Sequence, residues 1–155
     1  MTVQILQALP EHANEVVRSL RIFDKGDVER VGLDTFPIIQ TAMRKSISTW
    51  AGFINNELVC ICGVYSSSIT SSSGYIWLIT TNKVEQHQFT FVRQSQILVR
   101  EIMSNYALIE GHVDARYERS IKWLKWLGFT LHEPVEYNSR MVRPFEMRNR
   151  EWPIQ

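Results

Sequence analysis

The feature that most constrains the fold is a change of hydrophobic period within residues 75–115, where a helix-like segment lies between two strand-like ones. Apolar side chains over residues 88–106 recur every three or four positions, as on one face of an α-helix. Residues 75–81 form an apolar run typical of a central strand, and residues 108–115 alternate like a strand with two distinct faces. This succession of strand, long helix and strand indicates a mixed α/β fold.

The N-terminal half extends the pattern. Residues 3–8 alternate like a strand, and Pro10 opens an amphipathic helix that reaches Ile22. Pro37, preceded by Phe36, starts a second predicted helix. Two β-rich runs follow, over residues 50–54 and 58–65. The turn between them contains Asn55 and Asn56, which predicts a hairpin because Asn tolerates a positive φ.

The C-terminal part adds a helix over residues 116–127, which Gly128 ends, and two strands over residues 129–133 and 141–147. The predicted order is therefore β-α-α-β-β-β-α-β-α-β-β. No internal repeat or second domain is evident, so we expect a single domain over residues 1–155.

The composition excludes several classes of protein. Hydrophobic residues make up 45% and charged residues 21% of the chain, as in ordinary globular proteins. The formal charge of +1 gives no global attraction to nucleic acid or to an anionic membrane. The longest apolar run, residues 58–65, is too short to cross a bilayer, and the N-terminus lacks a leader pattern. We expect a folded protein of cytosolic origin without a membrane segment.

The two cysteines are separated by a single residue in a predicted strand. Cys60 and Cys62 therefore point to the same face, and a disulfide across this spacing would be strained. No His or Cys cluster lies nearby in sequence to complete a zinc site. We predict two buried free thiols and no metal centre.

The best chemical candidate is the strand face that carries Glu110, His112 and Asp114. Alternate strand residues share a face, so these side chains could converge on a metal ion or share a proton. The alternative is a solvated or hydrogen-bonded strand edge, because only one His is present and further ligands are not evident.

Two other groups are candidates for contacts with partners. Trp126 falls between Arg119 and Lys122 on the wheel of the helix over residues 116–127, opposite its apolar side. An exposed Trp beside cations is typical of interface anchors, although Arg and Lys stems also cover such rings on ordinary surfaces. The other group is the C-terminal arginines, Arg140, Arg143, Arg148 and Arg150. They lack a nucleic-acid motif, so we expect a solvated face and no nucleic-acid partner.

The order of elements resembles the GNAT acyltransferase superfamily, whose fold has a central, mostly antiparallel sheet flanked by helices. In GNAT proteins the fifth strand leads into a helix of the form Asn-x-x-Ala-x-x-x-Tyr-x-x-x-Gly-Phe. This frame falls on residues 117–129, where Gly128 and Phe129 are retained. Its Tyr, which often protonates the departing thiolate of coenzyme A in the family, falls on Leu124, which has no proton to give.

The same resemblance implies where acetyl-coenzyme A would lie. GNAT enzymes hold the pantetheine arm through the backbone of the strand before the long helix, which corresponds to Leu78, Ile79 and Thr80. A glycine-rich loop that binds the pyrophosphate would follow Thr81, yet no glycine occurs over residues 75–110.

The second half of the chain is more specifically similar to the GNAT-like internal virion protein of short-tailed bacteriophages. The similarity is carried by residues 75–84, by the Ile-Lys-Trp-Leu-Lys core within residues 116–128, and by Leu131-His132-Glu133 running on to Pro144-Phe145. The similarity implies a protein that binds other phage virion or host proteins. Because the acid and the glycine loop of the GNAT pattern are missing, we expect a non-catalytic protein without a cofactor. Such a protein acts in virion assembly in the host cytoplasm or in the virion interior. The alternative is an N-acetyltransferase that moves an acetyl group from acetyl-coenzyme A to a protein or small-molecule amine.

Overall fold

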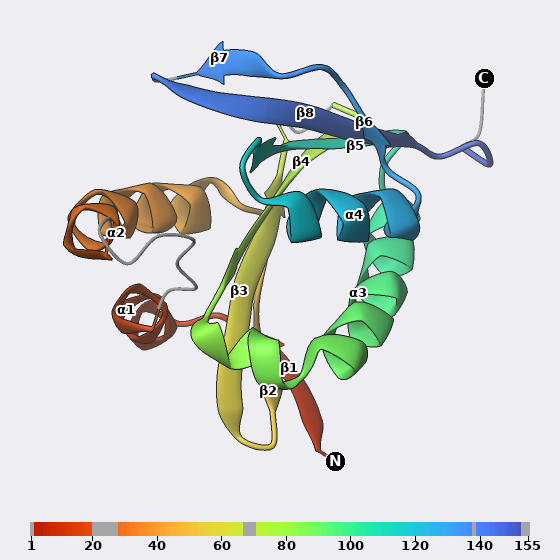
Figure 1. The fold of residues 1–155 in the computed structure, drawn as a ribbon. Helices are drawn as coiled ribbons and strands as arrows, with labels where there is room; N and C mark the ends of the chain where they lie inside the picture. The colour runs from red at the N-terminus through yellow and green to blue at the C-terminus, as the bar shows by residue number, and fades with distance from the viewer. Residues whose placement is uncertain (1, 20–27, 67–70, 138, 153–155) are drawn as a thin grey trace. The chain divides into compact units, whose positions relative to one another are not determined.

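The computed structural model describes residues 2–19, 28–66, 71–137 and 139–152, with the backbone alone over residues 28–36. The elements in chain order (Figure 1) are β1 (Val3–Gln7), α1 (Pro10–Arg18), α2 (Val28–Lys45), β2 (Ser48–Ile54), β3 (Glu57–Tyr65), β4 (Ser73–Thr80), the 3₁₀ helix η2 (Asn82–Gln86), α3 (Gln88–Met103), β5 (Leu108–Asp114), α4 (Glu118–Leu127), β6 (Thr130–Leu131), β7 (Val135–Tyr137) and β8 (Arg140–Arg148). The chain forms two compact units, Met1–Tyr65 with Trp77–Phe91 and Ser66–Ile76 with Val92–Gln155. The expectation of a single domain stays a prediction.

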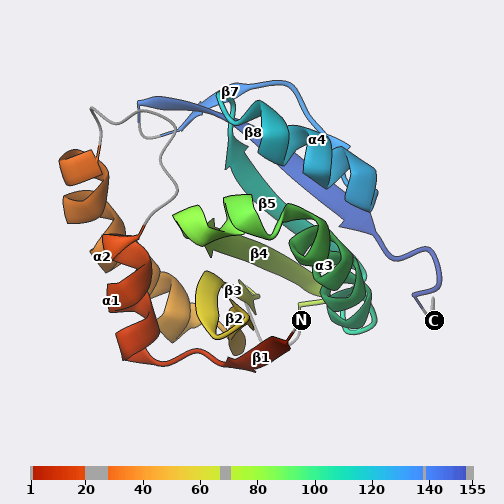
Figure 2. The ribbon, with the colours of Figure 1, turned by 60° about the horizontal axis from the view of Figure 1, so that its bottom comes forward.

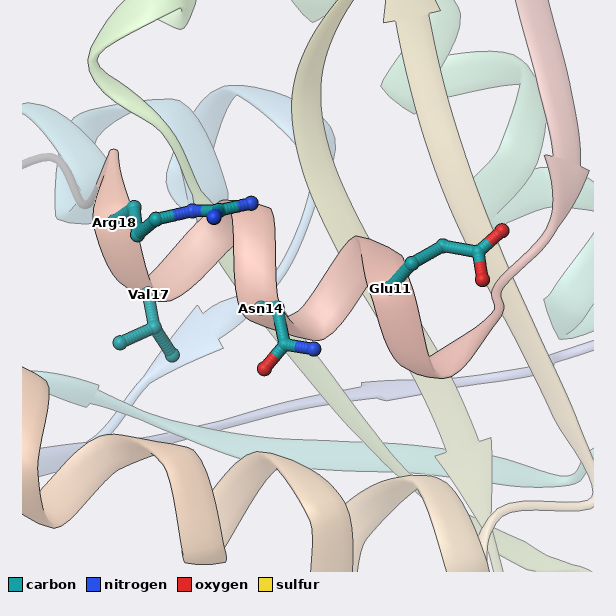
Figure 3. Close-up of a pocket in the computed structure, with 4 residues that line it drawn as sticks. All are labelled: Glu11, Asn14, Val17 and Arg18. Atoms are coloured by element: carbon teal, nitrogen blue, oxygen red, sulfur yellow. The ribbon is translucent and has the colours of Figure 1, made fainter.

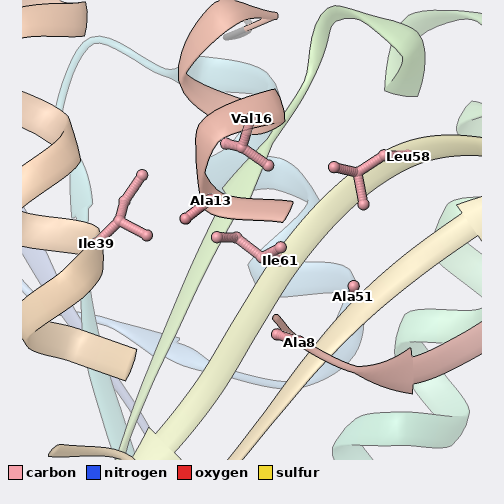
Figure 4. Close-up of a cluster of buried hydrophobic side chains, with 7 residues drawn as sticks. All are labelled: Ala8, Ala13, Val16, Ile39, Ala51, Leu58 and Ile61. Atoms are coloured by element: carbon pink, nitrogen blue, oxygen red, sulfur yellow. The ribbon is translucent and has the colours of Figure 1, made fainter. Parts of the chain in front are cut away.

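In the first unit, strands β1, β2, β3 and the second half of β4 adjoin in that order. Pairing of β1 with β2 and of β2 with β3 is antiparallel. Helices α1 and α2 supply side chains to a core that also includes the strands (Figure 4). This core consists of Ala8, Ala13, Val16, Ile39, Ala51, Leu58 and Ile61.

A second cluster in the same unit contains Ile54, Val59 and Cys60, against which Phe91 from the start of α3 packs. Strand β3 is therefore buried along almost its whole length, since side chains from both of its faces lie in a core. Cys60 and Cys62 are both buried and free, as the sequence predicts.

The β2–β3 hairpin turns through Asn55 and Asn56, whose φ angles are 51° and 66°. Two central residues with positive φ are characteristic of a type I′ turn, whose twist matches that of the flanking strands. A register shift follows, because Gly52 pairs with Cys60 and Phe53 with Leu58. This β-bulge at Val59 brings Leu58 and Ile61 into the same core although they are three residues apart.

In the second unit, β5 lies between the first half of β4 and β8, and β6 and β7 both pair with β8. The β4–β5 pairing is parallel and covers Ser73–Tyr75 and Leu108–Glu110, whereas β5–β8 is antiparallel. Helix α4 lies alongside β5 and β8 (Figure 2). It ends at Gly128, whose φ of 107° suits a residue without a Cβ.

The predicted mixed α/β fold and the order of its elements are confirmed, and some boundaries are wrong. Helix α2 begins at Val28, with Pro37 inside it, although Pro favours the first turn of a helix. Helix α3 was predicted to end at Tyr106, but it ends at Met103. Strand β7 was not predicted. Residue Ile22 lies outside the described residues.

Within the described part of the chain, none of the helices combines the length and the apolar character needed to span a bilayer.

Candidate functional site

A hollow of about 350 Å³ in the second unit brings together several titratable side chains. Its lining residues are Tyr75, Glu110, Gly111, His112, His132, Pro144, Phe145 and Glu146. The strand register explains this convergence, because Tyr75 is paired with Glu110 and Glu110 with Glu146 across three adjacent strands. Paired residues point to the same face of a sheet, so β4, β5 and β8 each supply at least one polar side chain here.

Tyr75 and His112 form a hydrogen-bonded pair in this hollow. The Tyr75 Oη lies 2.7 Å from His112 Nδ1, and their ring centroids are 5.5 Å apart. On its other side the imidazole stacks on Tyr137 of β7, with 5.8 Å between centroids and 15° between planes. A phenol and an aromatic stack thus fix the orientation of the imidazole, as a general acid or base requires.

A second pair borders the same hollow. His132 Nε2 lies 3.0 Å from Glu146 Oε1, and the guanidinium of Arg148 lies 3.7 Å from the other carboxylate oxygen. The position of His132 is set by its backbone, which donates to Pro144 O at 2.8 Å and accepts from Arg143 Nε at 2.9 Å. Glu110 and Glu146 make the hollow attractive to a cationic group, because both carboxylates line it.

The structure brings together two of the three residues predicted as a strand-face site. Glu110 and His112 line the hollow, whereas Asp114 is bound to Arg116 by two side-chain contacts of 3.1 Å. Burial raises the pKa of Asp114, but hydrogen bonds from the Arg116 side chain and backbone outweigh it, and the net effect is a lowered pKa. No group of three metal-ligating side chains occurs among the described residues. The three residues therefore do not converge as a unit.

The strand expected to hold the pantetheine arm belongs to the first unit. Leu78 packs against the cluster around Val59, and Ile79 packs against the α1–α2 core. The backbone N–H of Thr81 donates to Val59 O at 2.9 Å, so it faces β3. Since backbone groups alternate along a strand, those of Leu78 and Thr80 face away from β3. The registered pairing of β4 with β5 covers Ser73–Tyr75 and does not include Leu78, Ile79 or Thr80.

The segment after this strand is a 3₁₀ helix whose amides already have acceptors. Asn82 N–H donates to Ser19 O, Lys83 N–H to Thr81 Oγ1, and Val84 N–H to Thr81 O. The Thr81 hydroxyl itself donates to Leu58 O at 2.7 Å and is buried. A pyrophosphate cradle needs backbone N–H groups that point outward. The segment therefore does not reproduce the phosphate-binding loop that the GNAT resemblance implies.

An ion pair further fixes the 3₁₀ helix to the hairpin. Lys83 Nζ lies 3.1 Å from Glu57 Oε2, and His87 Nε2 lies 3.7 Å from Glu57 Oε1. The hydrogen bond and the charge of Lys83 hold the pKa of the Glu57 carboxyl below its usual value. The ammonium group of Lys83 is therefore paired with the Glu57 carboxylate.

Leu124 occupies the helix position where the GNAT frame has its Tyr. It is 5% exposed and belongs to the buried side of α4, next to Ile121. The Leu124 side chain has no hydroxyl and faces the interior, so this position of α4 supplies no acid for a leaving thiolate.

The residues predicted to contact partners are exposed. Trp126 is 57% exposed, and Lys122 and Arg119 lie on the same side of α4, one and two helical turns before it, respectively. Among the C-terminal arginines, Arg143 and Arg148 have partners in the hollow's rim. Binding of a partner by Arg119, Lys122 and Trp126 stays a prediction, as does the absence of a nucleic-acid partner at the C-terminal arginines.

A separate hollow of about 320 Å³ lies along α1 and is lined by Glu11, Asn14, Val17 and Arg18 (Figure 3). Asn14 and Val17 point to the same side of the helix. None of the interactions described for its four lining residues is an acid–base pair like that of Tyr75 and His112. We therefore take the hollow around His112 as the candidate site.

Sequence reasoning missed the role of Tyr75, His132 and Glu146. They lie far apart in the chain and meet only through the pairing of β4, β5, β6 and β8. The usable signal was the presence of two His and two Glu on three predicted strands, but the order of strands in a sheet cannot be read from local patterns.

Comparison with known proteins places the fold. No family model and no curated protein matches the chain. RimL, the ribosomal L7/L12 α-N-protein acetyltransferase in complex with coenzyme A, superimposes with a TM-score of 0.67 at 14% identity, over 96% of this chain and 94% of that one. The ribosomal-protein-S5-alanine acetyltransferase from Vibrio fischeri gives 0.66 at 11% identity, over 99% and 97%. A chimera of the spermidine N-acetyltransferase SpeG from Vibrio cholerae and hSSAT gives 0.65 at 11%, over 96% of both chains.

These likenesses establish the GNAT fold for this chain, a mixed α/β architecture with a central, mostly antiparallel sheet flanked by helices. At such identities they concern the fold alone.

Proposed function

We propose that this chain is an N-acetyltransferase that takes an acetyl group from acetyl-coenzyme A and transfers it to an amine. The observation that carries the proposal is the second half of β4, where the backbone groups of Leu78 and Thr80 face away from β3 and are not part of the registered pairing with β5. Support also comes from the fold, because the three compared structures of that fold are acetyltransferases by name. Similarity of fold does not by itself establish an activity, so the proposal also has to rest on the residues of the site.

Acetyl-coenzyme A supplies an activated thioester when bound, and the chain must supply an uncharged amine. In the tautomer in which His112 Nδ1–H donates to the Tyr75 hydroxyl oxygen, Nε2 carries a lone pair. That nitrogen accepts the proton that an ammonium must lose before it can attack. Glu110 and Glu146 attract the ammonium, and Tyr137 keeps the imidazole ring in place.

Titration calorimetry with acetyl-coenzyme A tests the donor side of the proposal. We expect saturable binding and a rise in melting temperature with ligand concentration, since a ligand bound only by the folded state stabilises it by mass action. A matched control is free adenosine 3′,5′-bisphosphate, which should bind much more weakly because the 3₁₀ helix offers no phosphate cradle. Absence of binding at millimolar acetyl-coenzyme A would exclude the proposal.

A second candidate function is favoured by Leu124 and by the occupied amides of the 3₁₀ helix. In this candidate function the chain is a non-catalytic GNAT-like phage protein that binds virion or host proteins, either during assembly in the host cytoplasm or in the virion interior. Its contact surface is the exposed side of α4 with Arg119, Lys122 and Trp126.

The second candidate has its own test. Trp126→Ala should weaken co-purification with assembled particles by at least about tenfold, as expected for an aromatic interface anchor, while the melting temperature stays unchanged. Equal incorporation of the variant and the natural chain would contradict a role for this surface.

A further inference from the structure

Strand β1 is an edge strand with a regular row of outward backbone groups. It pairs with β2, and no described strand lies on its other side (Figures 1 and 2). Ala8 N–H donates to Thr49 O and Asn55 N–H donates to Thr2 O, so the even-numbered residues exchange hydrogen bonds with β2. Because these groups alternate along a strand, the N–H and C=O of Val3, Ile5 and Gln7 point away from β2.

The side chains of β1 have none of the features that usually prevent an edge strand from pairing with another strand. Ile5 is 43% and Leu6 48% exposed, and as neighbours they lie on opposite faces of the sheet. The strand Val-Gln-Ile-Leu-Gln has no charge and no proline, which are the usual devices that keep an edge from binding another strand. By contrast, β7 carries Glu136 and is preceded by Pro134.

The pattern of outward groups is complementary to itself. When two copies of β1 run antiparallel about a twofold axis through Ile5, Val3 of each copy lies opposite Gln7 of the other. Ile5 then lies opposite its own equivalent. All three outward residues of each copy form both of their hydrogen bonds in this register, and a shift by two residues leaves one of them without a partner.

A twofold axis places the central residue against itself, so that residue has to be neutral. Ile5 meets this condition, and the pair of Ile5 side chains buries apolar surface on one face. On the opposite face, Leu6 of each copy lies beside Gln4 of the other. We propose that β1 is the interface of a symmetric homodimer in which the β1 strands of two copies pair antiparallel about Ile5.

This interface is small. Two five-residue strands bury less than the roughly 1,200 Å² typical of stable interfaces, so the dimer should dissociate on dilution. Sedimentation velocity of the full chain over a wide concentration range should show the mass rising from 18.1 kDa to twice that value.

A charge-swap pair makes the test specific. Ile5→Lys and Ile5→Glu each place like charges opposite one another at the twofold axis, so each variant alone should sediment as a monomer. An equimolar mixture should recover dimers, because the introduced lysine meets the introduced glutamate across the axis only in the mixed species. Recovery also demonstrates that both variants are folded.

The matched control is Ile5→Thr, which is neutral and favours strands, and it should keep the dimer. Ile5→Pro removes an outward N–H and spares the bonds to β2, so it should give a folded monomer. The proposal is overturned if the natural chain remains at 18.1 kDa at several hundred micromolar, or if both charge variants remain dimeric on their own.

Discussion

Gly111 lines the candidate site at a position that has no room for a Cβ atom. A Cβ at this position would lie 2.5 Å from Phe145 Cζ and 2.9 Å from the carbonyl oxygen of Ile76. Phe145 in turn makes an edge contact with Phe129, with 5.0 Å between ring centroids. Even a methyl group on β5 therefore disturbs both a backbone atom and an aromatic pair.

We expect Gly111→Ala to destabilise the protein by about 1–3 kcal/mol, the usual cost of overpacking a well-filled core. The free energy of unfolding from urea titration measures it. Gly111→Ala combined with Phe145→Leu should recover part of the loss, because the shorter side chain vacates the space of the ring tip. An unchanged midpoint in the single variant would show that the strand can shift at no cost.

Asp114 predicts a defined dependence of stability on pH. Its pKa is lowered in the folded state, as the Arg116 hydrogen bonds outweigh its burial. A depressed carboxyl pKa contributes stability above the unfolded value, about 3.9, and this contribution is lost as the pH falls through the folded value. The gap in melting temperature between the natural chain and Asp114→Asn should therefore be constant near neutral pH and shrink below about pH 4.

Arg116→Gln provides the control for this assignment, since the same gap should be smaller in that background. A gap that persists undiminished at pH 2 would mean that the Asp114 contacts do not depend on its charge.

Single residues were the level at which sequence reasoning was least complete. It identified His112 and Glu110 from their strand spacing, and it placed Leu124 in the acid's position from a motif. Tyr75, the actual partner of His112, comes from a strand 37 residues away. Asp114 was expected in the same cluster, but a local contact with Arg116, two residues on, prevailed.

Among the elements, the β2–β3 hairpin is the one most strongly specified by local chemistry. Asn55 and Asn56 both have positive φ, which Asn tolerates and Gly adopts freely. Asn56→Gly should raise the free energy of unfolding by about 0.5–1 kcal/mol, whereas Asn56→Val should lower it by about 1–2 kcal/mol. Urea unfolding of the two variants measures both changes. Equal stability of the two would contradict a turn that requires positive φ.

The other elements show which patterns carry over from sequence to structure. The helical spacing of apolar residues predicted α3, and Gly128 predicted the end of α4. Pro37 was misleading, because a preference for the first turn does not exclude a helix that starts nine residues earlier. The 3₁₀ helix after β4 depends on hydrogen bonds to Ser19 and Leu58, and contacts over such sequence separations leave no local signature.

For the whole molecule, the order of elements was enough to indicate the GNAT fold, because that order is itself the distinguishing property of the fold. The narrower similarity to phage virion proteins is a different matter. It rests on short motifs, and it leads to the second candidate function. Whether the scaffold performs acetyl transfer therefore depends on the hollow around His112.

The most direct measurement is the rate at which coenzyme A thiol is released from acetyl-coenzyme A in the presence of amines, using a polyamine and a short peptide with a free N-terminus as acceptors. We expect release that requires an amine and yields the acetylated product by mass spectrometry. His112→Gln should slow it by about 10²–10⁴-fold, the usual contribution of a general base, with the melting temperature retained. Release at the background rate with every acceptor, or full activity in His112→Gln, would contradict acetyl transfer at this site.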